Sequence, residues 1–284
     1  MKIYKLVCSV LVFLSLTIYS CRPKPIKLDV EPAPEKLVVY SHLIPDKVMI
    51  ITLTKSFSAL NGFDESTLES LLVTGATVKV KFDGQVFDFI EINPGIYASY
   101  NEAYEYNQEY ELEIVSGEHT VTSKTIMLPQ IDFTSCLPQV DKFATDTNVY
   151  VNLSFDDEAN KSNWYLINFY NKNAQTNSLD GVNFFQNGTN NLMKTILVSD
   201  KEFSGSYIKK VELENASPTD SIAVTLSNIN EKYFDYLKIR STSGGSILNQ
   251  LNIEPISYPS NIVNGYGFFN AYFPDIRFYD LGQF

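Results

Sequence analysis

The chain has 284 residues, with 22 Lys and Arg against 33 Asp and Glu, and a formal net charge of −11. This acidity argues against nucleic acid as a partner, because phosphate binding needs clustered Lys and Arg and the longest basic cluster after the N-terminal leader is Lys209-Lys210. The length is enough for two domains of ordinary size.

The N-terminal residues predict export and lipidation. Lys2 and Lys5 precede an apolar run from 6 to 18, which is too short to span a bilayer. Ile18-Tyr19-Ser20-Cys21 resembles a bacterial lipobox, in which the cysteine is acylated and becomes the mature N-terminus. We therefore expect a lipoprotein signal peptide at 1–20 and a lipid anchor, such as palmitate, on Cys21. A plain signal peptide or an N-terminal anchor helix is the alternative.

A proline-rich tether is predicted at 21–35. Residues 22–35 contain four prolines, which prevent a helix and interrupt any sheet ladder. At about 3.1 Å per residue in an extended polyproline-like state, the tether reaches roughly 40 Å. Such a reach suits a protein that docks on a neighbour in the same membrane.

Short β-runs with turn residues between them begin at Lys36. Residues 76–82 alternate apolar and polar side chains, and Asp83-Gly84 predicts a tight hairpin into the next run. Strands are predicted at 36–43, 47–55, 76–82, 85–92, 96–100, 110–115 and 120–127. Their regular spacing predicts an N-terminal β-sandwich at 36–129, immunoglobulin-like or prealbumin-like.

A less regular linker is predicted at 130–144 and a C-terminal β domain at 145–284. Residues 164–170 are apolar on both faces, as expected for a central strand, and 231–241 have the spacing of a helix. Further strands are predicted at 148–155, 195–198, 207–213 and 221–229. The overall prediction is an all-β protein, whose second domain is a larger β-sandwich or open barrel with one short helix.

Motifs of enzymes are scarce. The two histidines, His42 and His119, lie 77 positions apart, and no His-x-x-x-His, Cys-x-x-Cys, Gly-x-Ser-x-Gly or phosphate-loop pattern occurs. After loss of the leader and acylation of Cys21, only Cys136 remains, and it has no histidine nearby in the sequence. We predict no catalytic residue, metal or cofactor.

Asp156-Asp157-Glu158 is the densest group of carboxylates in the second domain. Such oxygens could hold calcium or supply the acid and base of a glycosidase. However, the run lacks the spacing and glycine of a calcium loop, and adjacent strand residues point to opposite faces. A solvated turn explains the run without further assumptions.

Tyrosines gather in the first domain. Tyr rings are enriched at interfaces because they give wide amphipathic contact at low entropic cost. Acidic residues between these tyrosines indicate a wet face, although sandwich core is the alternative. The candidate binding surface consists of Tyr97, Tyr100, Tyr104, Tyr106 and Tyr110.

Several ordered motifs resemble one family. The helix Glu231-Lys-Tyr-Phe-Asp-Tyr-Leu-Lys238 and the close Ser260-Asn-Ile-Val-Asn-Gly-Tyr-Gly-Phe-Phe269 look like the end of a Bacteroidota lipoprotein family known as domain of unknown function 4249. That family has Gly where Asn264 stands here. Its Ser-Asp-x-x-Phe-x-Gly, Gly-Ala-x-Val and Gly-x-Tyr elements are matched at 199–205, 75–78 and 95–97.

The resemblance implies an outer-membrane lipoprotein, often encoded beside TonB-dependent transporters and their partner lipoproteins. It implies no catalytic residues. Asp220-Ser221-Ile222 also resembles the Bacteroidota O-glycosylation sequon, which makes Ser221 a candidate glycosylation site.

The leading hypothesis is a non-enzymatic accessory of a TonB-dependent uptake system, anchored to the outer membrane by its lipid on either the outer or the periplasmic face. It would bind the substrate or the transporter. A structural or adhesive envelope protein without a small ligand is the second hypothesis, and a hydrolase built on distant carboxylates is the third.

Overall fold

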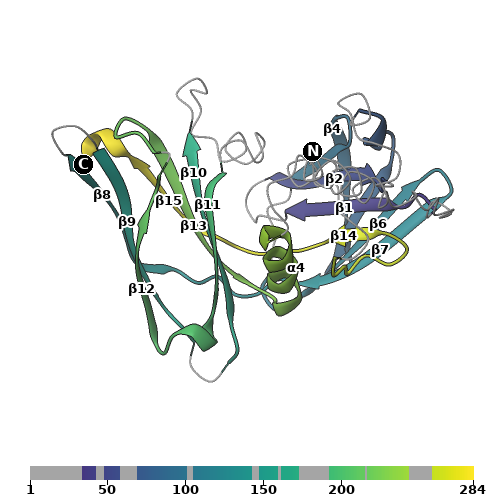
Figure 1. Ribbon diagram of the computed structural model, residues 1–284. Helices are drawn as coiled ribbons and strands as arrows, with labels where there is room; N and C mark the ends of the chain where they lie inside the picture. Colours follow the sequence, from purple (N-terminus) through teal and green to yellow (C-terminus); the bar gives the residue numbers. More distant parts are fainter. Residues whose placement is uncertain are drawn as a thin grey trace, which may run out of the picture. The chain divides into compact units, whose positions relative to one another are not determined.

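The computed structural model describes residues 34–42, 48–57, 69–100, 105–142, 147–158, 161–172, 192–214, 216–242 and 258–284 (Figure 1). The predicted signal peptide, Cys21, all but the last two residues of the tether, and Tyr104 lie outside these residues. Within the part described, no helix is long and apolar enough to cross a membrane.

The first part of the chain forms one eight-stranded sheet. Its strands along the chain are β1 (Leu37–His42), β2 (Val48–Lys55), β3 (Thr77–Phe82), β4 (Gln85–Asn93), β5 (Ile96–Tyr100), β6 (Glu109–Ser116), β7 (His119–Ile126) and β14 (Tyr266–Phe268). Their spatial order is β14-β1-β2-β5-β4-β3-β6-β7, so within this sheet the strand latest in the sequence lies beside the earliest. β1 and β14 run parallel, whereas the other pairs are antiparallel.

Local turn chemistry sets the register of the predicted hairpins. Asp83 and Gly84 both have positive φ, 45° and 71°, which is the backbone of the tight turn that suits two antiparallel strands. Across this turn Phe82 pairs with Gln85, and the alternation of β3 then places Val78 and Val80 in the interior. The sequence prediction of this hairpin is confirmed.

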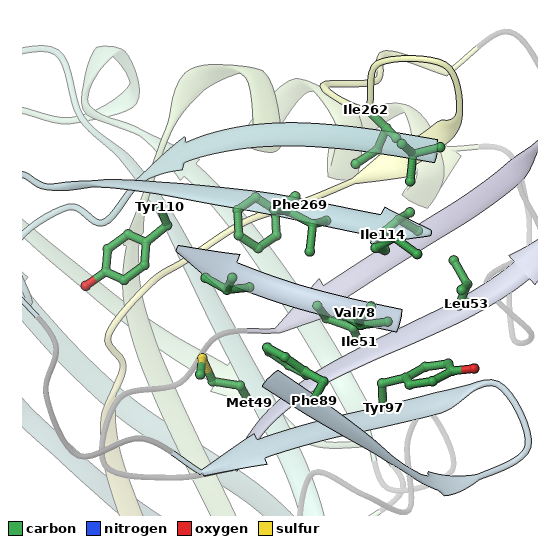
Figure 2. Close-up of a cluster of buried hydrophobic side chains, with 14 of the residues drawn as sticks. Met49, Ile51, Leu53, Val78, Phe89, Tyr97, Tyr110, Ile114, Ile262 and Phe269 are labelled. Atoms are coloured by element: carbon green, nitrogen blue, oxygen red, sulfur yellow. The ribbon is translucent and has the colours of Figure 1, made fainter. Parts of the chain in front are cut away.

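The sheet curls over a single core. Because β4 pairs with both β3 and β5, the sheet is continuous, and inward side chains from its two halves meet. Figure 2 shows Met49 and Ile51 of β2 in the same interior as Val78 of β3 and Ile114 of β6. Each fully buried aliphatic side chain of this kind contributes about 1.5–3 kcal/mol relative to exposure.

The second part is a sandwich of two sheets, in the order β12-β9-β8 and β11-β10-β13-β15. Val151 of β9, Ile167 of β10 and Val224 of β13 belong to the core between them. The elements are β8 (Phe133–Lys142), β9 (Thr147–Asp156), β10 (Trp164–Lys172), β11 (Leu192–Ser199), β12 (Ser206–Glu212), β13 (Ser221–Ile229), β15 (Asp275–Asp280), helix α4 (Glu231–Thr242) and the 3-10 turns Asp200–Glu202 and Leu281–Gln283. The all-β prediction with one short helix is confirmed.

Strand β8 corrects the linker predicted at 130–144. Two features hide this strand in the sequence: its register shifts between Phe133 and Ser135, and it contains Pro138. The shift breaks the period of two that indicates a strand, and proline is confined to edge strands, which is the place β8 takes.

A third cluster of buried side chains, here called the junction cluster, joins the first sheet, helix α4 and the outer face of β10. Leu166 of β10 and Phe268 of β14 belong to it, together with Tyr233 and Tyr236 of the helix. Helix α4 begins where the side chain of Asn230 accepts a hydrogen bond from the Tyr233 amide at 2.9 Å. The cap therefore fixes the point at which the two tyrosines turn inward.

Candidate functional site

The predicted tyrosine surface is corrected at two of its five positions. Tyr97 and Tyr110 are 1% and 0% exposed, because β5 and β6 place them on their inward faces. The Tyr97 hydroxyl donates to the Val73 carbonyl at 2.8 Å and accepts from the Ala76 amide at 3.0 Å. The ring of Tyr110 stacks on Phe82 with centroids 4.5 Å apart.

Burial also changes the acidity of these two phenols. It raises the pKa of Tyr110 to about 12, since the phenolate would lose its hydration, and it raises the pKa of Tyr97 in the same direction. Both hydroxyls remain neutral hydrogen-bonding groups within the core. They hold the fold together and are inaccessible to a ligand.

The other described tyrosines of that segment are exposed but separate. Tyr100 is 65% exposed at the end of β5. Tyr106 is 40% exposed, and its ring centroid lies 5.7 Å from that of Phe273 in an edge-to-face arrangement. With Tyr97 and Tyr110 inside, the described tyrosines do not form the continuous surface that the sequence predicted.

The carboxylates of Asp156-Asp157-Glu158 are engaged by local donors. Asp156 accepts from the Ser206 hydroxyl at 2.5 Å, and Asp157 accepts from the Asn163 amide at 3.0 Å and from the Tyr165 hydroxyl. Glu158 pairs with Lys161 at 2.6 Å. Among the residues described, no three His, Cys, Asp or Glu side chains gather as a metal site.

Cys136 lies on the inward side of β8 and is 6% exposed. Burial raises the pKa of its thiol to about 11, so the thiolate needed for nucleophilic attack is scarce at neutral pH. The Tyr279 hydroxyl donates to the Cys136 carbonyl, which ties β15 to β8. These contacts give Cys136 a packing role.

Ser221, the candidate glycosylation site, is the first residue of β13 and is half-buried. The neighbouring Asp220 carboxylate accepts from the Asn171 side-chain amide at 2.7 Å and from the Ser217 amide at 2.8 Å. The sequon thus lies at the beginning of β13, where the Asp220 side chain is held by two hydrogen bonds. Glycosylation of Ser221 stays a prediction.

The motif at 260–269, here called the closing segment, connects the two edges of the eight-stranded sheet. Val263 bridges to Thr122 of β7, and β14 pairs with β1. The Asn261 side chain accepts from the Phe269 amide at 2.9 Å and donates to the Phe269 carbonyl at 2.7 Å. Asn264 has φ of 64°, a conformation that asparagine tolerates better than most residues, which explains how it replaces glycine.

The remaining motifs of the resemblance have structural roles as well. In the Gly-Ala-x-Val and Gly-x-Tyr elements, the Glu91 carboxylate accepts from the Gly75 amide at 2.7 Å and from the Gly95 amide at 3.4 Å. In the Ser-Asp-x-x-Phe-x-Gly element, Ser199 and Glu202 form a capping box, and Phe203 packs on Tyr165. These residues specify the fold.

An open face of the sandwich offers the strongest candidate site. Along β9, Val149, Val151, Leu153 and Phe155 point inward, so the intervening residues face solvent. Residues opposite them in β8 and β12 complete this surface. We call it the polar face and define it as Leu137, Gln139, Asp141, Asn148, Tyr150, Asn152, Ser154, Asp156, Ile208, Lys210 and Glu212.

A network of side chains crosses the polar face from strand to strand. The Asn152 amide donates to Gln139 at 3.1 Å, and the Gln139 amide donates to Asp141 at 2.8 Å. Lys210 places its ammonium 4.0 Å from the centroid of the Tyr150 ring and 3.8 Å from the Asp141 carboxylate. The network holds these groups side by side, with hydrogen-bonding capacity left on the amides.

The side chains of the polar face are of kinds that suit binding. They include an aromatic ring, amides and one ion pair, the groups that give adaptable polar contact in binding surfaces. The sequence analysis predicted a strand at 148–155 without naming its polar residues as a site. The alternation of Asn148, Tyr150 and Asn152 with valines already indicates that these three side chains share one face of the strand. Gln139 and Asp141 could not be added to them from the sequence, because strand β8 was not predicted.

The comparisons with known proteins place the chain in one family. Residues 23–275 match the model described as "Domain of unknown function (DUF4249)". The comparison with curated proteins found no match.

Two solved structures give weak likenesses. Trypsin-activated alpha-2-macroglobulin from Escherichia coli is 10% identical over 72% of this chain and 15% of its own, with a TM-score of 0.23. Bovine butyrophilin is 9% identical over 68% of this chain and 92% of its own, with a TM-score of 0.21. The chain thus spans about a seventh of the macroglobulin, and at these TM-scores neither likeness supports an argument.

Proposed function

Because the chain belongs to the DUF4249 family, we propose that it is a lipid-anchored outer-membrane accessory of a TonB-dependent uptake system. In this proposal it binds the substrate of that system and catalyses no reaction. The observation that carries the binding role is the polar face, whose half-buried amides, aromatic ring and ion pair lie side by side on the outer side of one sheet.

Attachment through Cys21 follows from charge and motif. The chain carries 33 acidic residues against 22 basic ones, so it does not adhere to an anionic membrane by charge. The lipobox supplies an acyl anchor instead, and several acyl chains hold a protein far more firmly than one. The proline-rich residues that follow give the folded part room to reach a transporter.

A binding role without catalysis is supported by the state of the reactive groups. The Cys136 thiol is buried with a raised pKa, and the Asp157 carboxylate accepts from Asn163 and Tyr165. The Tyr97 and Tyr110 hydroxyls lie within the core. The amides of the polar face, by contrast, keep hydrogen-bonding capacity for a ligand.

Lipidation can be tested by labelling cells with palmitate. We expect the wild-type protein and Cys136→Ser to take up the label, because both keep Cys21, and we expect Cys21→Ser to lose it. Cys136 is the matched control, since it is the other cysteine that follows the leader. Equal labelling of Cys21→Ser would rule out the anchor.

The uptake role can be tested with a gene deletion. The deletion strain should lose uptake of one class of nutrient, and the wild-type gene should restore it. A gene carrying Gln139→Ala with Asn152→Ala should not restore uptake, whereas Gln85→Ala, which removes an exposed amide from β4, should. Normal uptake of every nutrient class by the deletion strain would refute the proposal.

A second candidate function, assembly with other envelope proteins, is favoured by exposed apolar side chains. Val86 and Ile90 of β4 are 50% and 70% exposed, and Tyr100 of the neighbouring β5 is 65% exposed. Apolar side chains gathered on a sheet indicate protein contact. Co-purification of envelope proteins without a transporter would favour this function.

A further inference from the structure

We infer that the polar face binds an uncharged polysaccharide. This inference rests on the proposed function, because it names the class of substrate for the same surface. It is carried by the chemistry of the side chains that the three strands place next to one another.

Side-chain amides dominate the centre of the face. Gln139, Asn148 and Asn152 each offer a donor and an acceptor in one plane, which matches two hydroxyls on neighbouring carbons of a sugar. Asn152 uses one amide hydrogen on Gln139, and Asn148 uses one on the Tyr150 hydroxyl at 3.4 Å. The network orients these amides without using all of their capacity, which lowers the entropic cost of binding.

The face carries more acid than base. Lys210 lies 3.8 Å from Asp141 and also covers the ring of Tyr150. Glu212, which lies opposite Tyr150, and Asp156 add two exposed carboxylates on the same side of the sheet. An anionic polymer would therefore be repelled by the face as well as by a protein of net charge −11, so among polysaccharides an uncharged, hydroxyl-rich one fits the amides best.

Apolar groups flank the amides in a way that also suits sugars. Leu137 is 57% exposed and lies directly opposite Asn152, while Ile208 is 79% exposed and lies opposite Ser154. These side chains can pack on the C–H faces of sugar rings while the amides bind the hydroxyls. Neighbouring strands lie about 4.8 Å apart, so polar groups repeat across the sheet, which favours a repeating polymer over a single sugar.

The test is affinity electrophoresis of the full lipidated protein in mild detergent. The probes are dextran, a mixed-linkage β-glucan, a galactomannan and a neutral xylan, with polygalacturonate as the anionic comparison. We expect at least one neutral polymer to retard the wild-type protein and polygalacturonate to have no effect. Gln139→Ala with Asn152→Ala should weaken binding about tenfold, since two hydrogen-bonding amides are lost.

Two further variants test whether the effect is specific to the polar face. Tyr150→Phe preserves the ring but loses the hydroxyl, and it should bind the polymer more weakly by a few fold. Gln85→Ala, in β4 of the eight-stranded sheet, should bind as the wild type does. The inference is overturned if no neutral polymer binds, if polygalacturonate binds best, or if the Gln139 and Asn152 variant binds unchanged.

The outcomes separate this inference from the proposed function. Recovery of a TonB-dependent transporter without any binding of neutral polymers would overturn the ligand class alone. Binding of a neutral polymer without an associated transporter would overturn the uptake role and leave the ligand class standing.

Discussion

At the scale of single residues, the hydroxyl of Tyr97 joins two segments that lie apart in the sequence. It donates to Val73 and accepts from Ala76, so the Gly-x-Tyr element is bonded to the Gly-Ala-x-Val element. Both ends of this connection are backbone groups. Loss of the hydroxyl would leave a buried carbonyl without its donor, which is costlier than the net value of one hydrogen bond.

We therefore predict that Tyr97→Phe lowers the free energy of unfolding by about 1–2 kcal/mol. Tyr100→Phe, three positions further along β5, should change it by less than about 0.5 kcal/mol, because Tyr100 is 65% exposed. Urea denaturation of the two variants measures the difference. Equal values for both would contradict the role of the Tyr97 hydroxyl.

Gly267 allows the closing segment to lie against strand β1. It has φ of +95°, and a Cβ at this position would lie 1.9 Å from the Val39 carbonyl oxygen of β1. No flexible side chain is available to move aside, since the obstacle is backbone. Only glycine allows β14 to approach β1 this closely.

Gly267→Ala should cost more than about 3 kcal/mol or abolish folding altogether. The matched control is Gly117→Ala, which also has positive φ but has open space around the Cβ position, and it should cost about 1 kcal/mol. Thermal unfolding of both variants separates close approach from backbone conformation. A Gly267→Ala protein as stable as Gly117→Ala would contradict the account of this segment.

At the scale of elements, the short helix α4 is held in place by hydrogen bonds at its N-terminus. Asn230 caps it by accepting from the Tyr233 amide, and its own amide donates to Asn270 at 3.0 Å. The same residue thus begins the helix and ties it to the chain beyond the closing segment. Tyr233 and Tyr236 then enter the junction cluster.

Asn230→Ala should lower the free energy of unfolding by about 1 kcal/mol, the usual value of an N-cap. Asn230→Asp keeps an acceptor for the Tyr233 amide and should recover most of that loss. Lys232→Ala, an exposed position of the same helix, should be nearly neutral. Chemical denaturation of the three variants is the measurement, and an Asp variant as unstable as the Ala variant would argue against the cap.

The elements that the sequence predicts well are those whose signals are local. The hairpin at Asp83-Gly84 and helix α4 follow from turn residues and from helical spacing. Strand β8 was missed because its bulge and Pro138 remove the local pattern. Pairing of β14 with β1 could not be predicted either, since it joins residues more than 200 positions apart and depends on the closing segment.

In the candidate site, too, some residues follow from local sequence patterns and others only from the order of strands in the sheet. Asn148, Tyr150 and Asn152 are predictable as the outer residues of one strand, but Gln139 and Lys210 join them only through sheet order. Conversely, Tyr97 and Tyr110 are spaced like surface residues among acidic neighbours. Their inward orientation follows from strand register, which a one-residue shift reverses.

At the scale of the whole molecule, buried phenols make stability sensitive to alkaline pH. Burial raises the pKa of Tyr110 to about 12 and also raises the pKa values of Tyr165 and Tyr233. In the unfolded chain these groups ionise near pH 10. The folded state therefore holds their protons more tightly than the unfolded state does.

The sign follows from proton linkage. Stability from these groups is fully present below pH 10 and is lost as the pH rises toward 12, because the unfolded state releases protons first. We predict a fall in the free energy of unfolding across this range, with a shallower fall in Tyr110→Phe. Urea denaturation at several pH values measures it, and a pH-independent free energy up to pH 12 would contradict the burial of these phenols.

The junction cluster and the closing segment show that the first sheet and the sandwich are built together. Residues from β1, β10, α4 and β14 share one buried cluster, and residues after the helix complete the first sheet. Two of the family motifs, the helix at 231–238 and the segment at 260–269, lie in these shared parts. The residues of these motifs stabilise the fold by packing and strand pairing. The surface proposed for function is the polar face.

The most direct test of the central claim is a mild-detergent pull-down of the tagged, lipidated protein from native outer membranes, followed by mass spectrometry. An accessory of a TonB-dependent uptake system should recover a transporter of that class in stoichiometric amount, and Cys21→Ser should lose it with the membrane anchor. Recovery of the wild-type protein alone, or with partners that include no transporter, would contradict the account.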